Sequence, residues 1–353
     1  MLFNIDSDSG ARIEGWIMPD NPSVTPSVMI VVAGEIAGTI KAHVLRPLLR
    51  EQGLHDTGVC GFIIDAKNCP GITGANHVEI FDIDTNVRIY RRRPATADVD
   101  AKLFRLEAQL LRDATLNETL EPNFHMPFTR LESFPEETAK SILGISFSPS
   151  IYVTGRVHYR VFEPLLRDRG FKSCAYLRDP VEELAEQLLL LQWAATRPKA
   201  ALKGVLHESF LDLVAVIEPE SMSTLGNLER WLTGLSPRAR LTLTDPMTRL
   251  LTCMSPDDRA SPQALAEALD TLGELTAVGF RSDMRTFTAH LEAGLDQDFP
   301  KIETRPTAKR VTHLAAQLDK FDVVNQLLAT DRELYAAARQ AFDAALEDRR
   351  ARA

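Results

Sequence analysis

The chain has 353 residues, of which 44% are hydrophobic and 25% are charged, a composition typical of a globular protein with two domains. Its formal net charge of −9 argues against a nucleic-acid partner, because neutralising phosphates requires a basic face. The sequence contains no apolar run long enough for a membrane span and no secretory signal at its start, so we expect a cytoplasmic protein.

The first 93 residues have the pattern of short β-strands. Apolar and polar residues alternate in "ARIEGWIM", and "SVMIVVAGEIAGTIKA" indicates two strands joined by a turn at Gly34, which is typical of a hairpin. Two further stretches, "CGFIIDA" and "HVEIFDIDTNVRIYRR", are separated by the turn-rich "KNCPGITGAN". Strands of this length and spacing predict an antiparallel β-sandwich module over residues 1–93.

Four widely spaced cysteines lie along the chain: Cys60, Cys69, Cys174 and Cys253. The first two share a segment with His55 and His77, which raises the alternative of a zinc site. Their spacing matches no standard set of zinc ligands. We therefore expect reduced thiols and no metal.

After Pro94 the pattern becomes helical. The leucines that recur at helical spacing are Leu103, Leu106, Leu110 and Leu111. A second helix is indicated by "FPEETAKSILGI", in which Pro135 lies near the start. Together these stretches predict a helical linker region over residues 94–144.

The remaining chain, residues 145–353, alternates strand and helix before turning almost wholly helical beyond residue 196. "SIYVTG" and "FKSCAYL" indicate strands, and "HYRVFEPLLRDRG" between them indicates a helix that ends at Gly170. A strand, a helix and a strand in succession predict a parallel sheet, with ligand sites at the carboxyl ends of its strands. The fold class is therefore α/β, with an N-terminal sandwich and a large helical C-terminal part.

Arg178 occupies the carboxyl end of the second of these strands, in the stretch "YLRDPVEELAEQLLLLQW". A guanidinium donates hydrogen bonds in pairs, which suits a phosphate group. The alternative is structural: Arg178 pairs with Asp179 or a nearby glutamate and fixes the turn before the helix that Pro180 starts. Residue types alone leave both interpretations open.

The segments "SIYVTGRV" and "YLRDPVEELAEQL" together resemble the core of carbohydrate sulfotransferases, the group that includes the heparan 2-O enzymes. In that family a strand that ends near Gly-His precedes a strand that ends in Arg-Asp-Pro and a helix. Later segments resemble the family in the same order: "LTDPMTRLL", "SPQALAEALDTLGELTAVGFRSDMRTFTAHLEAGL" and "LLATDRELYAAARQAF". The resemblance implies a sulfotransferase-like core within residues 145–353.

This resemblance implies transfer of a sulfuryl group from 3′-phosphoadenosine 5′-phosphosulfate (PAPS) to a sugar hydroxyl. It implies that Arg178 binds the 3′-phosphate of the nucleotide, with Arg249 as a second basic contact. Where the family has Gly-His, this chain has Gly155-Arg156, with His158 two positions on. His158 is therefore the candidate general base, and a structural histidine is the alternative.

Two departures from the family concern the donor site. The chemistry needs a glycine-rich phosphate loop with a lysine, yet no glycine occurs between Gly74 and Gly144. Glu186 stands where the family has a serine, and its carboxylate would repel a 3′-phosphate. We therefore predict a pseudoenzyme that uses no cofactor. The alternative is an active PAPS-dependent sulfotransferase with a donor site rebuilt from three arginines, Arg156, Arg178 and Arg249.

The N-terminal part resembles a β-rich module attached to bacterial glycosyltransferases and surface-polysaccharide proteins. The features that carry this resemblance are Gly15-Trp16, Gly34, "HVLRPLLREQG" and Gly61-Phe62. Trp16 is a candidate for stacking on a sugar, and a core tryptophan is the alternative. Both resemblances imply a binding or scaffold protein of bacterial surface-glycan biosynthesis, with a carbohydrate or a glycan-assembly protein as partner. A protein-interaction module built on the helical C-terminal half is a further alternative.

Overall fold

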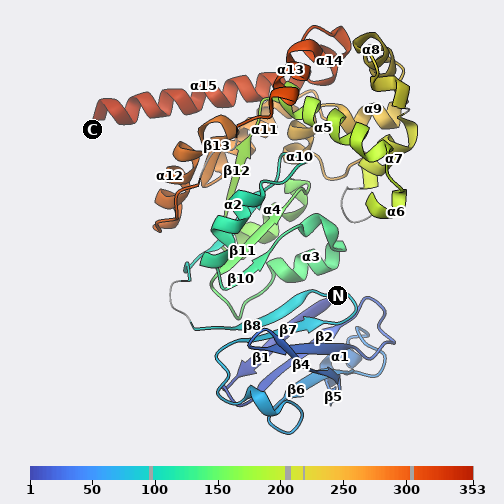
Figure 1. Cartoon of the computed structure of the whole chain (residues 1–353). Coiled ribbons are helices and arrows are strands. Elements are labelled where there is room, and N and C mark those ends of the chain that lie inside the picture. Colours follow the sequence, from blue (N-terminus) through green and yellow to red (C-terminus); the bar gives the residue numbers. More distant parts are fainter. Residues whose placement is uncertain (95–97, 203–207, 218, 303–305, 353) are drawn as a thin grey trace. The chain divides into compact units, whose positions relative to one another are not determined.

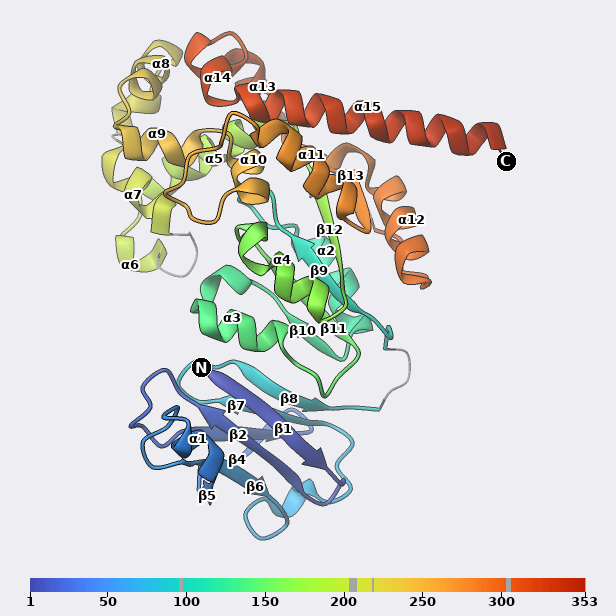
Figure 2. The ribbon, with the colours of Figure 1, turned by 180° about the vertical axis from the view of Figure 1, so that it is seen from behind.

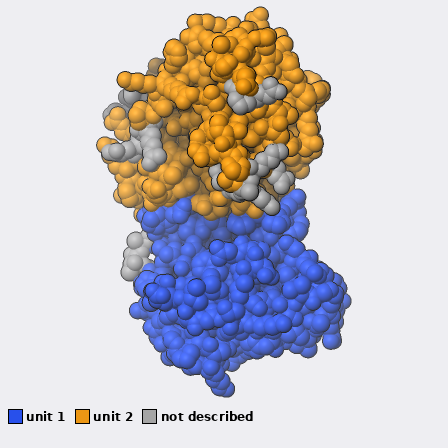
Figure 3. Space-filling view, turned by 45° about the vertical axis from the view of Figure 1, so that its right-hand side comes forward, with its two compact units in different colours: residues 1–102, 121–128, 134–152 blue, residues 103–120, 129–133, 153–353 orange. Residues whose placement is uncertain are grey.

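The computed structural model describes residues 1–94, 98–202, 208–217, 219–302 and 306–352 (Figure 1). The chain forms two compact units, shown in different colours in Figure 3. The first contains Met1–Lys102, Glu121–Phe128 and Phe134–Tyr152, and the second contains Leu103–Leu120, Thr129–Ser133 and Val153–Ala353. Each unit therefore takes three separate stretches of the sequence.

Two antiparallel four-stranded sheets open the first unit, which confirms the predicted antiparallel architecture (Figure 2). Their strand orders are β1-β2-β6-β5 and β4-β3-β7-β8. Ile13 and Ile17 in one sheet and Ile30 and Ile80 in the other are fully buried, because alternate side chains of each strand face the core. The strands are β1 (Leu2–Asp8), β2 (Ile13–Met18), β3 (Ser27–Val32), β4 (Glu35–Lys41), β5 (Val44–Leu45), β6 (Val59–Ile64), β7 (Val78–Asp82) and β8 (Arg88–Arg92).

The predicted hairpin is confirmed in β3 and β4, which pair antiparallel. Its two turn residues, Ala33 and Gly34, have φ values of 52° and 88°. Positive φ at both central positions is the geometry that lets a two-residue turn follow the twist of its strands.

A five-stranded parallel sheet, in the order β10-β11-β9-β12-β13, forms the α/β part of the fold. Its strands are β9 (Lys102–Leu106), β10 (Met126–Phe128), β11 (Ile151–Gly155), β12 (Phe171–Leu177) and β13 (Ala277–Phe280). The predicted strands before and after Arg156 are present as β11 and β12. They are not neighbours, because β9 lies between them.

The helix expected from the leucines at 103–111 is wrong, since Leu103 and Leu106 belong to the central strand β9. A strand covered on both faces is apolar almost throughout and loses the alternation that marks a half-exposed strand. A short helix, α2 (Ala114–Leu120), follows only after a loop, and α3 (Glu136–Leu143) begins directly after Pro135 as predicted.

Helices make up most of the second unit, which confirms the predicted helical C-terminal part (Figure 1). Their bounds are α4 (Tyr159–Asp168), α5 (Pro180–Ala195), α6 (Lys199–Leu202), α7 (Glu208–Val216), α8 (Leu225–Thr233), α9 (Pro237–Leu243), α10 (Pro246–Thr252), α11 (Ala264–Glu274), α12 (Met284–Leu295), α13 (Lys309–Leu318), α14 (Asp322–Leu327) and α15 (Ala329–Arg352). In the first unit, α1 (Pro47–Glu51) is the short helix before β6. Within the described ranges no helix is both long and apolar enough to cross a membrane.

Candidate functional site

The candidate site lies where β12 passes into α5. Asp179 is the N-cap of α5, and its carboxylate accepts hydrogen bonds from the backbone N–H groups of Val181 (2.9 Å) and Glu182 (3.0 Å). Such a cap satisfies donors that the first helical turn leaves without partners. Pro180 follows as the first helical residue, a position that needs no N–H. The Asp-Pro pair is therefore explained by helix initiation.

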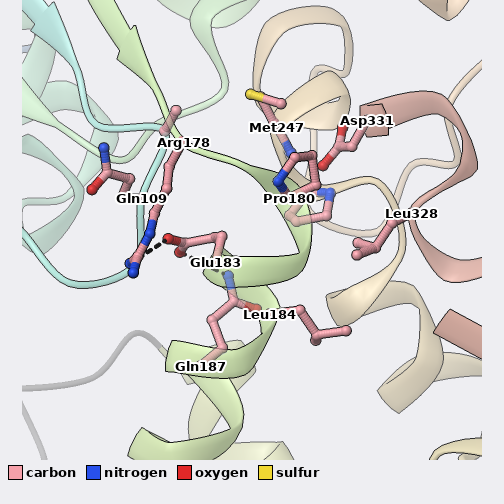
Figure 4. Close-up of a pocket in the computed structure, with 11 residues that line it drawn as sticks. Gln109, Arg178, Pro180, Glu183, Leu184, Gln187, Met247, Leu328 and Asp331 are labelled. Atoms are coloured by element: carbon pink, nitrogen blue, oxygen red, sulfur yellow. Dashed lines mark hydrogen bonds and ion pairs between the residues drawn. The ribbon is translucent and has the colours of Figure 1, made fainter. Parts of the chain in front are cut away.

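Arg178 is almost completely buried, with 2% of its side chain exposed, and it lies against three carboxylates. Its Nε is 3.6 Å from Glu182, its Nη1 is 3.6 Å from Glu183, and Nη1 also donates a short hydrogen bond to Glu186. Figure 4 shows the Arg178 side chain turned toward Glu183. The glutamate at the position of the family's serine is thus a direct partner of this arginine.

The loop between β9 and α2 follows the central strand of the sheet. In this strand–loop–helix arrangement, free N–H groups can bind an anion. Here the N–H of Leu110 donates to Glu183 Oε1 at 2.7 Å, and Gln187 Nε2 donates to the same oxygen at 3.0 Å. The carboxylate of Glu183 therefore takes the hydrogen bond that this loop N–H group could otherwise donate to an anion.

Arg156 forms hydrogen bonds with two neighbouring segments of the chain. Its backbone N–H donates to Glu132 Oε2 (2.9 Å), and its Nη1 donates to the carbonyl of Ala108 (3.0 Å). Burial lowers the pKa of the Arg156 guanidinium, and the carboxylates of Glu183 and Glu132 oppose that shift. Arg156 therefore lies near Glu183, the same carboxylate of α5 that bonds to the loop after β9.

The guanidinium of Arg249 points into main-chain carbonyls. Nε donates to Asp258 O at 3.0 Å, and the two terminal nitrogens donate to the carbonyls of Leu241 and Pro256. These bonds tie α10 to the end of α9 and to the loop after α10. The guanidinium of Arg249 therefore donates its hydrogen bonds to the protein's own main chain.

His158 precedes α4 and reaches α10. Its Nδ1 donates to the carbonyl of Arg249 at 3.2 Å, which leaves Nε2 as the proton acceptor of the neutral ring. Burial lowers the pKa of His158, and the positive charges of Arg249 and Arg156 lower it further. The ring is therefore neutral at pH 7.

Two aspartates cap two helices reciprocally beside this site. Asp331, near the start of α15, accepts the backbone N–H groups of Met247 (2.9 Å) and Thr248 (2.7 Å) in α10. Asp245, before α10, accepts the N–H groups of Thr330 and Asp331, each at 2.9 Å. Burial, followed by the charge of Asp245, raises the pKa of Asp331 to about 6.

Two hollows border Arg178. The first, drawn in Figure 4, has a volume of about 10 Å³, which is room for roughly one water molecule. The second has a volume of about 360 Å³. Its lining residues are Arg178, Asp179, Glu182, Arg281, Ser282, Pro306, Thr307 and Tyr335.

Trp16 belongs to the first unit, on β2, where it lies opposite Asn4 of β1 and Gly61 of β6. It is half-buried, whereas its neighbours Gly15 and Ile17 are buried. By alternation along the strand, its ring lies on the outer face of this sheet.

The cysteines are buried and free. Across the described ranges no group of three or more His, Cys, Asp or Glu side chains could hold a metal ion. A scan against models of known protein families finds no match to the chain, and a search of curated proteins finds none either. The sulfotransferase resemblance therefore stays a prediction.

Sequence reasoning missed the participation of Glu183, Leu110 and Asp331 in this region. One sequence feature could have indicated Glu183, since it lies with Glu182 and Glu186 in the first two turns after Arg178. Leu110 and Asp331 reach the site only through contacts between distant segments, for which the sequence pattern offers no local indication.

Proposed function

We propose that this chain is a sulfotransferase-related pseudoenzyme that acts as a binding or scaffold protein in bacterial surface-glycan biosynthesis. The observation that carries the proposal is the contact of Arg178 with Glu182, Glu183 and Glu186. A guanidinium surrounded by three carboxylates presents no net positive charge to a nucleotide phosphate. The residue that the family resemblance assigns to the 3′-phosphate is therefore neutralised within the fold.

The residues at the carboxyl ends of β9 and β12 do not fit PAPS. The loop after β9 contains neither glycine nor lysine, and the N–H of Leu110 is already bonded to Glu183. The hollow between this loop and α5 has a volume of about 10 Å³, far below the several hundred Å³ of typical small-molecule sites. Both features support a role other than sulfuryl transfer.

The larger hollow beside Arg178 supports a binding role. Its volume of about 360 Å³ lies within the range of small-molecule sites. Tyr335 supplies an aromatic ring and Ser282 and Thr307 supply hydroxyl groups to its lining, a combination suited to the apolar face and the hydroxyls of a sugar ring. Asp179 and Glu182 balance Arg178 and Arg281 there, which favours a neutral sugar.

Titration calorimetry with 3′-phosphoadenosine 5′-phosphate tests the donor-site part of the proposal. We expect no saturable binding below about 1 mM, an affinity weaker than roughly 4 kcal/mol. Micromolar binding that Arg178→Ala abolishes would overturn the proposal.

Saturation-transfer NMR with a panel of neutral monosaccharides and oligosaccharides tests the binding part. We expect transfer to at least one sugar, its loss in Tyr335→Ala and its retention in Trp193→Ala, which removes an exposed aromatic residue of α5 outside this lining. If no sugar in the panel receives transfer, the sugar-binding part is contradicted.

One observation favours an active PAPS-dependent transferase as the second candidate: the neutral ring of His158 has Nε2 available as a proton acceptor. A general base must accept a proton in the protonation state present at working pH. The test is transfer of labelled sulfate from PAPS to glycan acceptors, with loss in His158→Ala. Absence of transfer to every acceptor would count against this candidate.

A further inference from the structure

A pocket with a volume of about 300 Å³ lies in the first unit, at one end of the sheet β4-β3-β7-β8. It is formed where β3 ends, β7 begins and β8 ends. Its lining residues are Val31, Ala33, Gly34, His77, Val78, Glu79, Arg91 and Arg92. A volume of this size is at the lower end of the range for small-molecule sites.

The strand register places three of these side chains in one row across the sheet. Val31 of β3 pairs with Glu79 of β7, and Glu79 pairs with Arg91 of β8. The adjacent residues Ile30 and Ile80 are fully buried, so the row lies on the face that points away from the sandwich core. The row combines an apolar wall, a carboxylate and a guanidinium.

The arginines around Glu79 are not paired equally well with carboxylates. Glu79 accepts a hydrogen bond of 2.6 Å from Arg88 Nη1, while Arg91 Nε lies 3.7 Å from the same carboxylate. By contrast, Arg92 has a carboxylate of its own, Asp8, whose Oδ2 accepts from Arg92 Nε at 2.6 Å. One carboxylate therefore serves two guanidinium groups, and Arg91 is the more distant of the two.

Arg91 also has few other partners. Among the described residues, the hydrogen bond found for its guanidinium is a long one, 3.4 Å from Nη1 to the carbonyl of His125. About 23% of its side chain is exposed, and Arg91 contributes to the lining of the pocket. A guanidinium can donate two parallel hydrogen bonds to one carboxylate or sulfate group.

Neighbouring groups experience an excess of positive charge at this end of the sheet. Burial lowers the pKa of Arg91, and the charge of Arg88 lowers it further. The pKa of His125 is lowered by burial and additionally by Arg93, Arg91 and Arg88. In a chain with a net charge of −9, this local positive potential favours an anion.

We propose that this pocket binds a molecule of about monosaccharide size that carries a carboxylate or a sulfate, with Arg91 donating to the oxyanion. The wall formed by Val31, Gly34 and His77 contacts the rest of the ligand. The anion supplies the counter-charge that Glu79 shares between Arg88 and Arg91. This site is made of first-unit residues alone and does not depend on the proposed function.

The test is titration calorimetry with sodium glucuronate, inorganic sulfate and, as neutral control, glucose. We expect glucuronate to bind with a dissociation constant of about 1 mM or below and glucose not to bind. Arg91→Gln should weaken glucuronate binding by at least about tenfold. Arg12→Gln is the matched control, because it removes an exposed arginine paired with Glu14 outside the pocket, and it should leave binding unchanged.

A second variant separates binding from folding. Glu79→Gln removes the competing carboxylate and should tighten glucuronate binding severalfold, whereas a general disturbance of the sheet would weaken binding in both variants. If Arg91→Gln does not fold, Arg91→Lys keeps the charge and should bind more weakly than the wild-type protein. Equal affinity of wild type and Arg91→Gln, or no binding of glucuronate and sulfate up to about 10 mM, would overturn the proposal. Binding of sulfate alone would overturn the expected sugar acid and identify a simple anion site.

Discussion

Replacing Arg178 by alanine should destabilise the second unit strongly. The side chains of Arg178, Glu183 and Glu186 are 2%, 9% and 15% exposed, so the substitution takes the nearest cation from two largely buried carboxylates and leaves Glu186 only the more distant Arg281, at 3.7 Å. Removing one partner of a buried ion pair costs about 3–5 kcal/mol. In a domain of about this size each kcal/mol lowers the melting temperature by about 2–4 °C, which gives a decrease of roughly 6–20 °C.

Arg167→Ala provides a matched comparison. Arg167 also contacts two carboxylates, Glu163 at 2.6 Å and Glu274 at 3.1 Å, but 69% of its side chain is exposed. Exposed ion pairs contribute about 0–1 kcal/mol. The two variants therefore remove the same chemical group from a buried and from a solvated environment.

Urea unfolding followed by circular dichroism, together with calorimetric melting, measures both variants at pH 7. We expect Arg178→Ala to lose several times more unfolding free energy than Arg167→Ala. Equal losses in the two variants would refute the structural role of Arg178. An increase in stability in Arg178→Ala would do so as well, because that is the common result when a residue kept for ligand binding is removed.

Further predictions concern pH and packing. Asp331 has a pKa of about 6 in the folded chain, above the ordinary aspartate value of about 3.9. Its proton therefore stabilises the fold below about pH 4, and this contribution is lost as pH rises through 6. Urea unfolding should show the wild-type advantage over Asp331→Asn falling by about 3 kcal/mol across that window. Gly279→Ala should cost about 1–3 kcal/mol, because its new Cβ would lie 2.4 Å from Phe287 Cβ. Gly273→Ala in α11, where nothing lies within 4 Å, should be neutral or stabilising by up to about 1 kcal/mol. Equal melting shifts in the two glycine variants would contradict this packing.

Elements with a local pattern could be predicted from the sequence. The hairpin follows from two alternating stretches around Gly34, and α5 follows from Pro180 and the apolar stripe through Leu184 and Leu188, both of which are buried in the helical core. In each case the residues that determine the structure are neighbours in the chain. Periodicity and turn chemistry were therefore sufficient.

The central strand β9 could not be found in the same way. Strand β9 has apolar side chains on both of its faces, and Arg105, the charged residue among them, is fully buried. Arg105 donates to Glu107 and Asn117 at 2.6 Å each, so the partners that make its burial tolerable lie partly on another element. Strand β13 was not predicted, because it has four residues and lies in a part of the chain whose pattern is almost wholly helical.

The candidate site was placed at the end of β12 by the rule that ligand sites gather at the carboxyl ends of parallel strands. The side chain that fills this site could not be predicted, because Leu110 and Glu183, which are hydrogen-bonded to each other, are 73 positions apart. Pairing of Arg178 with a nearby glutamate was the structural alternative at the level of the sequence, and in the fold Glu186 is bonded to Arg178. Residue types do not reveal which of the nearby glutamates lies closest to Arg178, because that depends on the geometry of the side chains.

The most direct test of the central claim is the coupling free energy between Arg178 and Glu186, measured by urea unfolding of Arg178→Met, Glu186→Gln and the double variant. Side chains that contact each other in this way typically couple by about 0.5–3 kcal/mol. We predict a coupling of at least about 1.5 kcal/mol, because the contact is shielded from solvent. Additive effects within about 0.5 kcal/mol would contradict the claim that the protein's own carboxylates hold this arginine.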